Sequence, residues 1–312
     1  MTPSRNIDVS VVIPIYRNAP FIVELYSRLK EEFEQCELNF EIIFVNDSSP
    51  DDSWEKIKDL VNSDNRVIGL DLSRNFGQHY AITAGLDKSS GDWIVVMDGD
   101  LQDKPEEIKK MFMKAREGYD IVQGRRYQRK DKFLKKLSSK LFYKIFGYLT
   151  DTPQDESIAN FGIYSRRAVN VIVSMRESLR FFPTMIKWIG FKSTTLDIEH
   201  AERSEGESSY SFKNLLKLSL NTIISFSDKP LRLTVKVGFC ISAISFFCAI
   251  YIVIQSILGN ISIQGWASLI VSIWFIGGII ISIIGVTGLY ISRIFDETKR
   301  RPIYIVRETY EK

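Results

Sequence analysis

The sequence has few cysteines and histidines and almost no excess of charge. Only three cysteines occur among the 312 residues, Cys36, Cys240 and Cys248, together with two histidines. An odd number of cysteines without regular spacing argues against a disulfide framework and against a zinc site. It also predicts that the folded domain faces a reducing compartment. The net charge is 41 − 38 = +3, too small an excess to indicate a nucleic-acid partner.

Several familiar motifs are also missing. Residues 1–8 contain no apolar core, so we expect no signal peptide. Neither G-x-G-x-x-G nor G-x-x-x-x-G-K-[ST] occurs, which argues against a dinucleotide enzyme and a P-loop NTPase. Charge is absent from residues 237–254 and 266–291, stretches of 18 and 26 residues. Each stretch can cross about 30 Å of hydrocarbon as a helix.

The two uncharged stretches predict a transmembrane hairpin, because only residues 259–265 connect them. Both outer ends then lie on one side. Basic residues flank both ends: Lys229, Arg232, Lys236, Arg293, Lys299, Arg300 and Arg301. This bias places both ends in the cytoplasm. The alternative, a buried hairpin in a soluble protein, fits such long uncharged stretches poorly. Gly277, Gly278, Gly285 and Gly288 permit close helix contact, within the hairpin or between subunits.

The predicted organisation therefore has three parts. Residues 1–228 form a cytoplasmic catalytic domain, residues 229–294 carry two spans at about 235–258 and 266–291, and residues 295–312 form a cytoplasmic tail. Two further segments, 132–149 and 212–226, predict amphipathic helices in the membrane interface. In the first of these, apolar residues recur at helical spacing and lysines fill the gaps. The alternative is a helix packed on the soluble core.

The first half of the chain has the pattern of an α/β domain. Short apolar runs at residues 10–16, 41–45 and 93–97 predict buried strands, and segments with helical spacing separate them. Alternating strands and helices indicate a mostly parallel sheet. Ligands bind such sheets at the carboxyl ends of the strands. The polar residues directly after these runs, Asp47 and Asp98, are therefore the first candidates for a site.

The pair Asp98 and Asp100, separated by Gly99, follows the third apolar run. Two carboxylates at a strand end suit Mg²⁺ or Mn²⁺, which bridges the phosphates of a nucleotide. The alternative is a solvated turn. Asp47 can accept hydrogen bonds from a base or ribose, or it can cap the helix predicted to follow it.

The chain resembles the polyprenyl-phosphate branch of the family 2 glycosyltransferases, which have the GT-A fold. The segments that carry this resemblance are SVVIPIYRN, EIIFVNDSSPDDS, LSRNFGQHYAITAGLD, GDWIVVMDGDLQDKPE, QGRRYQR, SRRAV, ERSEGESSYSF and the two-span tail ending in ETKRRPIYIV. They run through nearly the whole chain. The expected fold is a Rossmann-like, mostly parallel sheet with interface helices and a C-terminal transmembrane hairpin.

The resemblance implies a role for particular residues. Those implied to bind the donor or the lipid phosphate are Pro14, Tyr16, Asn18, Asp47, Arg74, Gly77, Arg126, Lys135, Ser139 and Arg203. Those implied to hold Mg²⁺ or Mn²⁺ and the donor diphosphate are Asp98, Asp100 and Gln102. The implied catalytic positions are Asp98, Asp100 and Asn160. The implied partners are a nucleotide-sugar donor, a polyprenyl phosphate, the bilayer and further copies of the chain in a dimer or tetramer.

The chain departs from the family pattern at three places. Asn160 stands where glucosyl-type relatives carry aspartate, Lys135 where arginine is usual, and Ser209 where lysine usually precedes the tyrosine. These differences leave the identity of the transferred sugar open. They do not predict loss of catalysis. The acceptor is a phosphate monoester, which has a second pKa of about 6, is therefore largely dianionic at pH 7 and needs no general base.

The predicted function is inverting transfer of a sugar, from a UDP-sugar by preference, to undecaprenyl or another polyprenyl phosphate in a bacterial inner membrane. The product would serve cell-envelope glycan synthesis or O-antigen modification. A processive polysaccharide synthase is disfavoured because the chain has two spans and no Gln-x-x-Arg-Trp motif. Two competing functions stay open: a transferase acting on a different lipid, and an inactive membrane scaffold.

Overall fold

The computed structural model describes residues 7–126, 158–198, 223–224, 227–258 and 265–312. The chain divides into two compact units. The first holds residues 1–143, 154–209 and 301–312, and the second holds residues 144–153 and 210–300. The predicted interface helices at 132–149 and 212–226 lie outside the described residues, apart from a short helical piece at residues 223–224.

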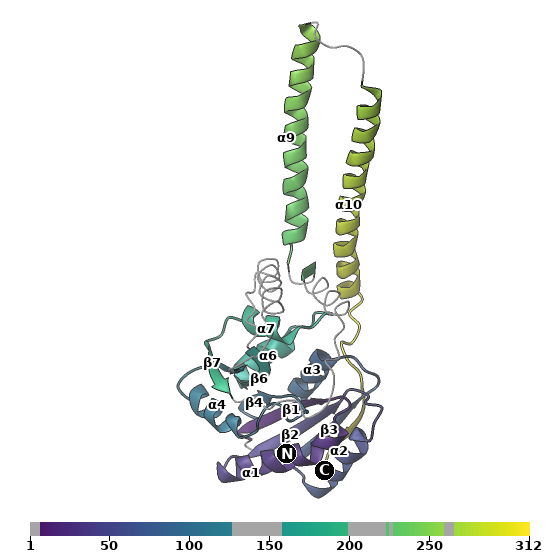
Figure 1. Ribbon diagram of the computed structural model, residues 1–312. Coiled ribbons are helices and arrows are strands. Elements are labelled where there is room, and N and C mark those ends of the chain that lie inside the picture. Colours follow the sequence, from purple (N-terminus) through teal and green to yellow (C-terminus); the bar gives the residue numbers. More distant parts are fainter. Residues whose placement is uncertain (1–6, 127–157, 199–222, 225–226, 259–264) are drawn as a thin grey trace. The chain divides into compact units, whose positions relative to one another are not determined.

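The first unit is built on one eight-stranded sheet in the order β7-β5-β6-β4-β1-β2-β3-β8 (Figure 1). Its strands are β1 (Val9–Ile15), β2 (Phe40–Asn46), β3 (Val67–Leu72), β4 (Trp93–Val96), β5 (Ile121–Arg126), β6 (Ile158–Ser165), β7 (Ser193–Ile198) and β8 (Val306–Tyr310). Strands β6 and β8 are antiparallel to their neighbours, and the other pairs are parallel. The predicted mostly parallel α/β sheet is confirmed.

Helices cover both faces of the sheet (Figure 1). They are α1 (Ile22–Gln35), α2 (Ser53–Ser63), α3 (Gln78–Lys88), α4 (Glu107–Ala115), α6 (Arg166–Ser174) and α7 (Phe182–Trp188). The apolar side chains of α1, α2 and α4 pack in one core cluster, and those of α3, α6 and α7 pack in the other. Every residue of β1 and β2 is buried, which explains why both strands are almost continuously apolar.

Helix α1 shows how the sequence builds these layers. Ile22, Leu25, Leu29 and Phe33 are buried and recur at helical spacing, so they form one stripe against the sheet. Burying one such side chain contributes about 1.5–3 kcal/mol. The charged residues of the helix lie on its other side. The same division recurs in α2 and α4.

Strand β8 is the C-terminal segment, and it pairs antiparallel with β3 at the edge of the sheet. Leu72 lies opposite Val306, so the chain enters β8 at the end of the sheet where β3 finishes. Side chains add to the pairing: Tyr304 Oη donates to Asp87 at 2.6 Å and Lys88 pairs with Glu311 at 2.7 Å. The segment predicted as a tail is thus part of the eight-stranded sheet, which its sequence pattern did not indicate.

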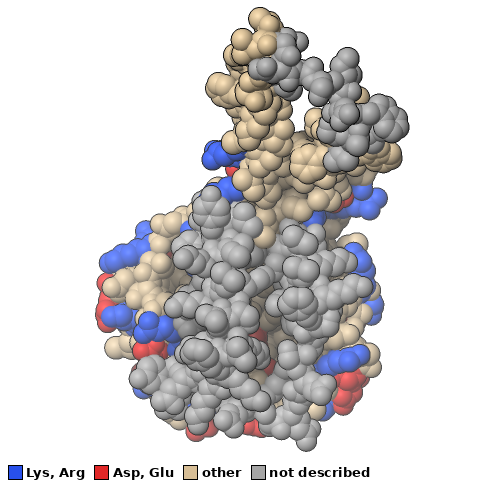
Figure 2. Space-filling model, turned by 45° about the horizontal axis from the view of Figure 1, so that its top comes forward, with Lys and Arg blue, Asp and Glu red and all other residues tan. Residues whose placement is uncertain are grey.

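The second unit contains two long helices, α9 (Lys229–Ile257) and α10 (Trp266–Thr298). Both contain windows long and apolar enough to cross a membrane, at Lys229–Cys248 and Ser272–Thr298. None of the side chains in these windows is buried by the protein itself. Figure 2 shows a surface without charged side chains over most of the described part of these helices. The domain bounds at residues 228 and 294 remain predictions.

Candidate functional site

The candidate site lies at the carboxyl edge of the parallel strands. The segments that leave this edge follow β1, β2, β3 and β4. The chain proceeds from β1 outward to β3, and then returns to place β4 on the other side of β1. This reversal is a topological switch point, where the two crossing connections diverge and leave a crevice between strand ends. Tyr16, after β1, and Asp98, after β4, border that point.

The segment from Asp98 to Gln102 is held in one conformation by its packing. Gly99 is buried, and a Cβ there would come within 2.6 Å of Ile15 Cδ1, so the Ile15 side chain would have to shift to admit a larger residue. Leu101 has φ of +61°, an uncommon left-handed conformation. The backbone N–H of Gln102 donates to Asp100 Oδ1 at 3.2 Å. Asp98 and Asp100 are both partly exposed, so both carboxylates can reach a ligand.

Asp98 is oriented by a residue that the sequence analysis did not select. Gln78 Nε2 donates to Asp98 Oδ1 at 2.6 Å. Gln78 is the first residue of α3, directly after the loop at residues 73–77. Its amide therefore connects this loop to the carboxylate at the end of β4. The only signal for it in the sequence was its place beside Gly77 in the segment that carries the resemblance.

Asp47 holds the loop at residues 73–77, which we call the β3 loop. Its Oδ1 accepts from the backbone N–H of Phe76 at 2.7 Å and its Oδ2 from that of Gly77 at 2.8 Å. Gly77 has φ of +105°, which favours glycine. Burial raises the pKa of Asp47, and the two backbone hydrogen bonds act in the opposite direction. Both oxygens are thus engaged in shaping the loop.

The loop after β1 is fastened to the turn after β2. Arg17 has φ of +59°, and its backbone N–H donates to Ser49 Oγ at 2.7 Å. The backbone N–H of Ala19 donates to Asp51 Oδ2 at 3.2 Å, and that of Tyr16 to Asn18 Oδ1 at 3.2 Å. These bonds leave the Tyr16 side chain 42% exposed at the edge of the sheet. An exposed ring in this place can stack on a flat base.

Of the remaining predicted site residues, some lie within the described part of the chain and others outside it. Pro14 is buried inside β1 opposite Val45, Arg74 stacks its guanidinium 4.4 Å from the Phe76 ring centre, and Arg126 ends β5 opposite Ile198. Asn160 lies in β6, where the register with β4 pairs Gly162 with Val96. Asn160 comes two residues before Gly162 in β6, and Asp98 comes two residues after Val96, beyond the end of β4. Lys135, Ser139 and Arg203 lie outside the described residues.

The donor set at Asp98 and Asp100 fits a divalent cation that shares its ligands with a substrate. Within the described residues, no group of three or more His, Cys, Asp or Glu side chains comes together. Mg²⁺ is commonly held by one or two carboxylates together with phosphate oxygens and waters. The two partly exposed carboxylates and the nearby Gln102 match that arrangement. A structural zinc site, by contrast, needs four protein ligands.

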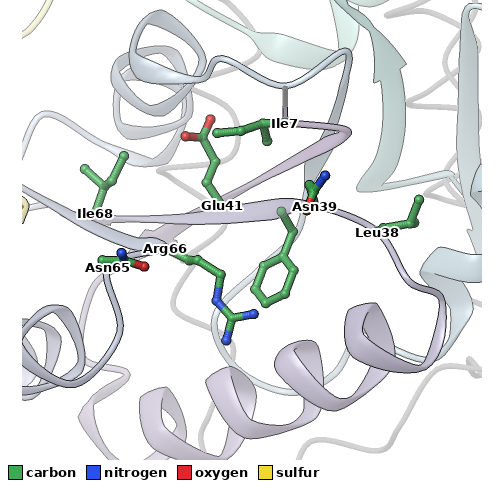
Figure 3. A pocket seen from close by; sticks show the side chains of 8 residues that line it. Ile7, Leu38, Asn39, Glu41, Asn65, Arg66 and Ile68 are labelled. Atoms are coloured by element: carbon green, nitrogen blue, oxygen red, sulfur yellow. The ribbon is translucent and has the colours of Figure 1, made fainter. Parts of the chain in front are cut away.

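The opposite, amino edge of the sheet carries a pocket of about 460 Å³ (Figure 3). Its lining comes from the first residues of β2 and β3 and from the segments before β1, β2 and β3: Ile7, Leu38, Asn39, Phe40, Glu41, Asn65, Arg66 and Ile68. Glu41 Oε1 already accepts from Ser10 Oγ at 2.6 Å and from the backbone N–H of Ser90 at 2.7 Å. None of the predicted site residues within the described part of the chain lines this pocket, so it is separate from the candidate site as described.

Comparison with protein families decides the assignment. The model of glycosyl transferase family 2 matches residues 10–172. The chain belongs to this family. It is a glycosyltransferase with the expected GT-A fold. The loops of the carboxyl edge after β1, β2, β3 and β4 lie within the matched region. Strand β8 lies outside it.

Curated relatives match over almost the whole chain. An uncharacterized glycosyltransferase of Bacillus subtilis, YkcC, is 40% identical over 98% of this chain and 95% of its own length. A prophage bactoprenol glucosyl transferase homolog of Escherichia coli is 35% identical over 96% of this chain and 98% of its own. The bactoprenol glucosyl transferase of Shigella phage SfV is 34% identical over 97% and 99%.

Among solved structures, glucosyl-3-phosphoglycerate synthase of Mycobacterium tuberculosis, in complex with Mn²⁺, UDP-glucose and phosphoglyceric acid, aligns with a TM-score of 0.49 at 15% identity. The alignment covers 70% of this chain and 77% of that one.

Proposed function

We propose that this glycosyltransferase moves a sugar from a nucleotide sugar, a UDP-sugar by preference, to a polyprenyl phosphate, with inversion at the anomeric carbon. The observation that carries the proposal is the pairing of the carboxylate site at the switch point with a chain that matches bactoprenol glucosyl transferases from end to end. Bactoprenol is a polyprenol. The two long apolar helices are consistent with an acceptor that resides in a bilayer.

The donor would be held by the loops of the carboxyl edge. Tyr16 and the turn at residues 46–49 are placed to receive the base and ribose, and the β3 loop to receive the adjoining phosphates. Asp98, Asp100 and Gln102 would hold Mg²⁺ or Mn²⁺ against the diphosphate, and this ion would neutralise the charge that develops on the leaving group. The close packing of Gly99 on Ile15 and the left-handed conformation of Leu101 shape the short segment that carries the two carboxylates.

The acceptor requires less chemistry from the protein than a sugar hydroxyl would. A phosphate monoester is already largely dianionic at pH 7 and can attack C1 directly. The protein has only to align this oxygen with C1 and to exclude water, which would otherwise hydrolyse the donor. Asn160 in β6 is the neutral group that would orient the sugar or the acceptor. Arg126, Lys135, Ser139 and Arg203 are the proposed phosphate-binding residues.

We propose that the protein resides in the bacterial inner membrane with its catalytic unit in the cytoplasm. Strand β8 follows the two apolar helices in the chain but belongs to the catalytic sheet. The chain must therefore cross the membrane an even number of times between β7 and β8. Two crossings satisfy this requirement, and the basic residues at both ends of the helices favour the cytoplasmic side. The product would enter cell-envelope glycan synthesis or O-antigen modification.

We further propose that the chain forms a dimer or tetramer through its long helices. At Gly277, Gly278, Gly285 and Gly288, no described atom lies within 4 Å of the place where a Cβ would stand. These backbone positions in α10 are open to close approach by another helix.

The test uses membranes that contain the full chain, undecaprenyl phosphate, Mn²⁺ or Mg²⁺ and a panel of UDP- and GDP-sugars, with the lipid product identified by mass. We expect a polyprenyl-phosphate sugar from the wild type and none from Asp100→Ala. Chelation should abolish product formation, and added Mn²⁺ or Mg²⁺ should restore it.

Two different results would favour the competing functions. Donor binding without transfer to undecaprenyl phosphate would indicate another lipid acceptor, to be sought among diacylglycerols. Absence of donor binding would indicate an inactive scaffold and would contradict the proposal.

A further inference from the structure

The C-terminal strand carries an arginine that contacts the back of the candidate donor site. Arg307 lies in β8, and its Nη1 donates to Asp71 Oδ2 at 3.1 Å. Its Nη2 donates to the backbone carbonyl of Ser73 at 2.7 Å. Asp71 is the second-to-last residue of β3, and Ser73 is the first residue after that strand. One guanidinium therefore holds both the end of β3 and the beginning of the β3 loop.

The contact continues from Asp71 to the turn after β2. Asp71 Oδ1 accepts from Asn46 Nδ2 at 2.7 Å, and Asn46 Oδ1 accepts from the backbone N–H of Ser49 at 3.2 Å. Ser49 Oγ in turn accepts from the backbone N–H of Arg17. A continuous set of hydrogen bonds thus runs from β8 through the ends of β3 and β2 to the loop after β1.

The burial of Asp71 shows why this position needs a cation. Asp71 is only 2% exposed, and Asn46 is also buried. A carboxylate in such a place is costly unless it is paired and hydrogen-bonded. Among its described contacts, Arg307 supplies the positive charge and Asn46 a neutral donor. The arginine fork can bind the carboxylate and the carbonyl of Ser73 together, which a lysine ammonium does less well.

We infer that Arg307 is a positioning residue for the nucleotide-sugar donor, and that β8 is therefore a part of the donor site although it follows the membrane helices in the chain. This inference deepens the proposed function and rests on it. Arg307 acts through Asp71 and Ser73: it fixes the start of the β3 loop, whose other end Asp47 holds through Phe76 and Gly77. Loss of the guanidinium should loosen donor binding without touching the acceptor.

Strand β8 has other anchors that avoid the donor loops, and these supply a control. Tyr310 Oη donates to Asn62 Oδ1 at 3.2 Å, and Lys312 donates to the backbone carbonyl of the same residue. Asn62 lies near the end of α2. The variant Tyr310→Phe therefore weakens the attachment of the strand but leaves the bonds of Arg307 in place.

The experiment compares Arg307→Met, Arg307→Lys and Tyr310→Phe in the full-length protein in membranes. For Arg307→Met we expect the donor KM to rise about tenfold, the cost of losing a charge-assisted hydrogen bond, while the KM for undecaprenyl phosphate stays within twofold of wild type. Arg307→Lys should recover part of the donor affinity. Tyr310→Phe should leave the donor KM unchanged.

A double variant, Asp71→Asn with Arg307→Met, separates positioning from stability. It removes the buried charge along with its partner, so folding should be restored relative to Arg307→Met. If Arg307 positions the loop, the donor KM stays raised in the double variant. A donor KM that returns to the wild-type value would show a purely structural role and overturn the inference.

Two further results are distinguishable. An active wild type with an equally active Arg307→Met would refute the inference and leave the proposed function intact. A wild type that neither binds a nucleotide sugar nor forms product would refute the proposed function and this inference together.

Discussion

The two edges of the sheet both carry carboxylates that are largely shielded from water, but they satisfy them differently. At the amino edge, Asp64 pairs with Arg66 at 2.7 Å and also accepts from Tyr26 Oη at 2.8 Å. At the carboxyl edge, the described hydrogen bonds of Asp47 come from neutral groups, the backbone N–H groups of Phe76 and Gly77. Neutral donors orient a carboxylate but leave its charge available to a cation or a charged ligand.

The backbone conformation of the loops also differs between the two edges. Among the described non-glycine residues of the first unit, positive φ is more frequent in the loops of the carboxyl edge, at Arg17, Ser48 and Leu101, than at the amino edge, where Glu37 adopts it. Such conformations persist only where the surrounding structure enforces them, and they are common at functional sites. The ion pair at the amino edge thus stabilises the fold, whereas the contacts at the carboxyl edge shape loops that can bind a ligand. Substitutions at the two edges should therefore separate activity from stability.

The largest effect on activity is expected from Asp98→Asn at the carboxyl edge. The amide cannot supply the charge that holds Mg²⁺ or Mn²⁺ against a diphosphate, so kcat/KM should fall by about 10³-fold or more. The matched control is Asp92→Asn, since Asp92 is exposed just before the amino end of the same strand. Transfer of radiolabelled sugar to lipid measures both. Equal losses in the two variants would remove the distinction between the edges.

A smaller effect is expected from Asp47→Asn. In asparagine one of the two acceptor oxygens becomes an NH₂ group, which faces the backbone N–H of Phe76 or Gly77 as a second donor, so the β3 loop should loosen. An unsatisfied buried donor costs about 1–3 kcal/mol, and the donor KM should rise about 10- to 100-fold. Steady-state kinetics with varied donor measure this change. A donor KM equal to that of wild type would show that the loop does not contact the donor.

A still smaller effect is expected from Gln78→Met, which keeps the length of the side chain and removes the hydrogen bond to Asp98. Loss of such an orienting partner typically reduces metal affinity about 10-fold or more. We expect the concentration of Mn²⁺ needed for half-maximal activity to rise by about this factor, with kcat recovered at saturating metal. If excess metal did not recover kcat, Gln78 would have a role beyond orienting Asp98.

No effect on activity at 25 °C is expected from Asp64→Asn at the amino edge. Burial alone would raise the pKa of Asp64, but hydrogen bonds from Arg66 and Tyr26 hold it at about 2. A lowered pKa contributes stability that is present above the unfolded value of about 3.9 and is lost as pH falls through about 2. The free energy of unfolding of the variant should be about 1–2 kcal/mol lower than that of the wild type at pH 7, and the difference should be about half as large at pH 3.

Thermal unfolding in detergent at the two pH values measures this difference. Glu55→Gln is the control, because the pair of Glu55 with Lys58 is exposed and should contribute less than about 0.5 kcal/mol. A loss for Asp64→Asn that did not change with pH would show that packing, rather than the ion pair, stabilises the amino edge.

The sequence predicted the carboxyl edge well because its strands are short, apolar and buried on both faces. The apolar run at residues 41–45 corresponds to β2, and the run at 93–97 to β4, so Asp47 and Asp98 could be placed at strand ends. The site roles of Asn160 and Arg126 were predicted from the family resemblance alone. Their strands meet only through pairing between β5 and β6, whose paired residues Gln123 and Gly162 lie far apart in the chain.

Strand β8 could not be predicted from local pattern. Its sequence, VRETY, has no buried residue and three exposed polar ones, so it resembles a solvated tail. Its identity as a strand depends on β3 offering an open edge. The roles of Arg307 and Asp71 were hidden for the same reason, because the two residues are brought together only by this pairing.

The pairing of β8 with β3 also sets an order of events during biosynthesis. Leu70 pairs with Thr309, so the partners are 309 − 70 = 239 positions apart in the chain. The ribosome therefore completes both apolar helices before it releases the strand that closes the sheet. Until then the outer edge of β3 has no partner from this strand, and open edges invite pairing with other chains. A chain that stops short of residue 306 would keep this edge open and would be a substrate for aggregation and quality control.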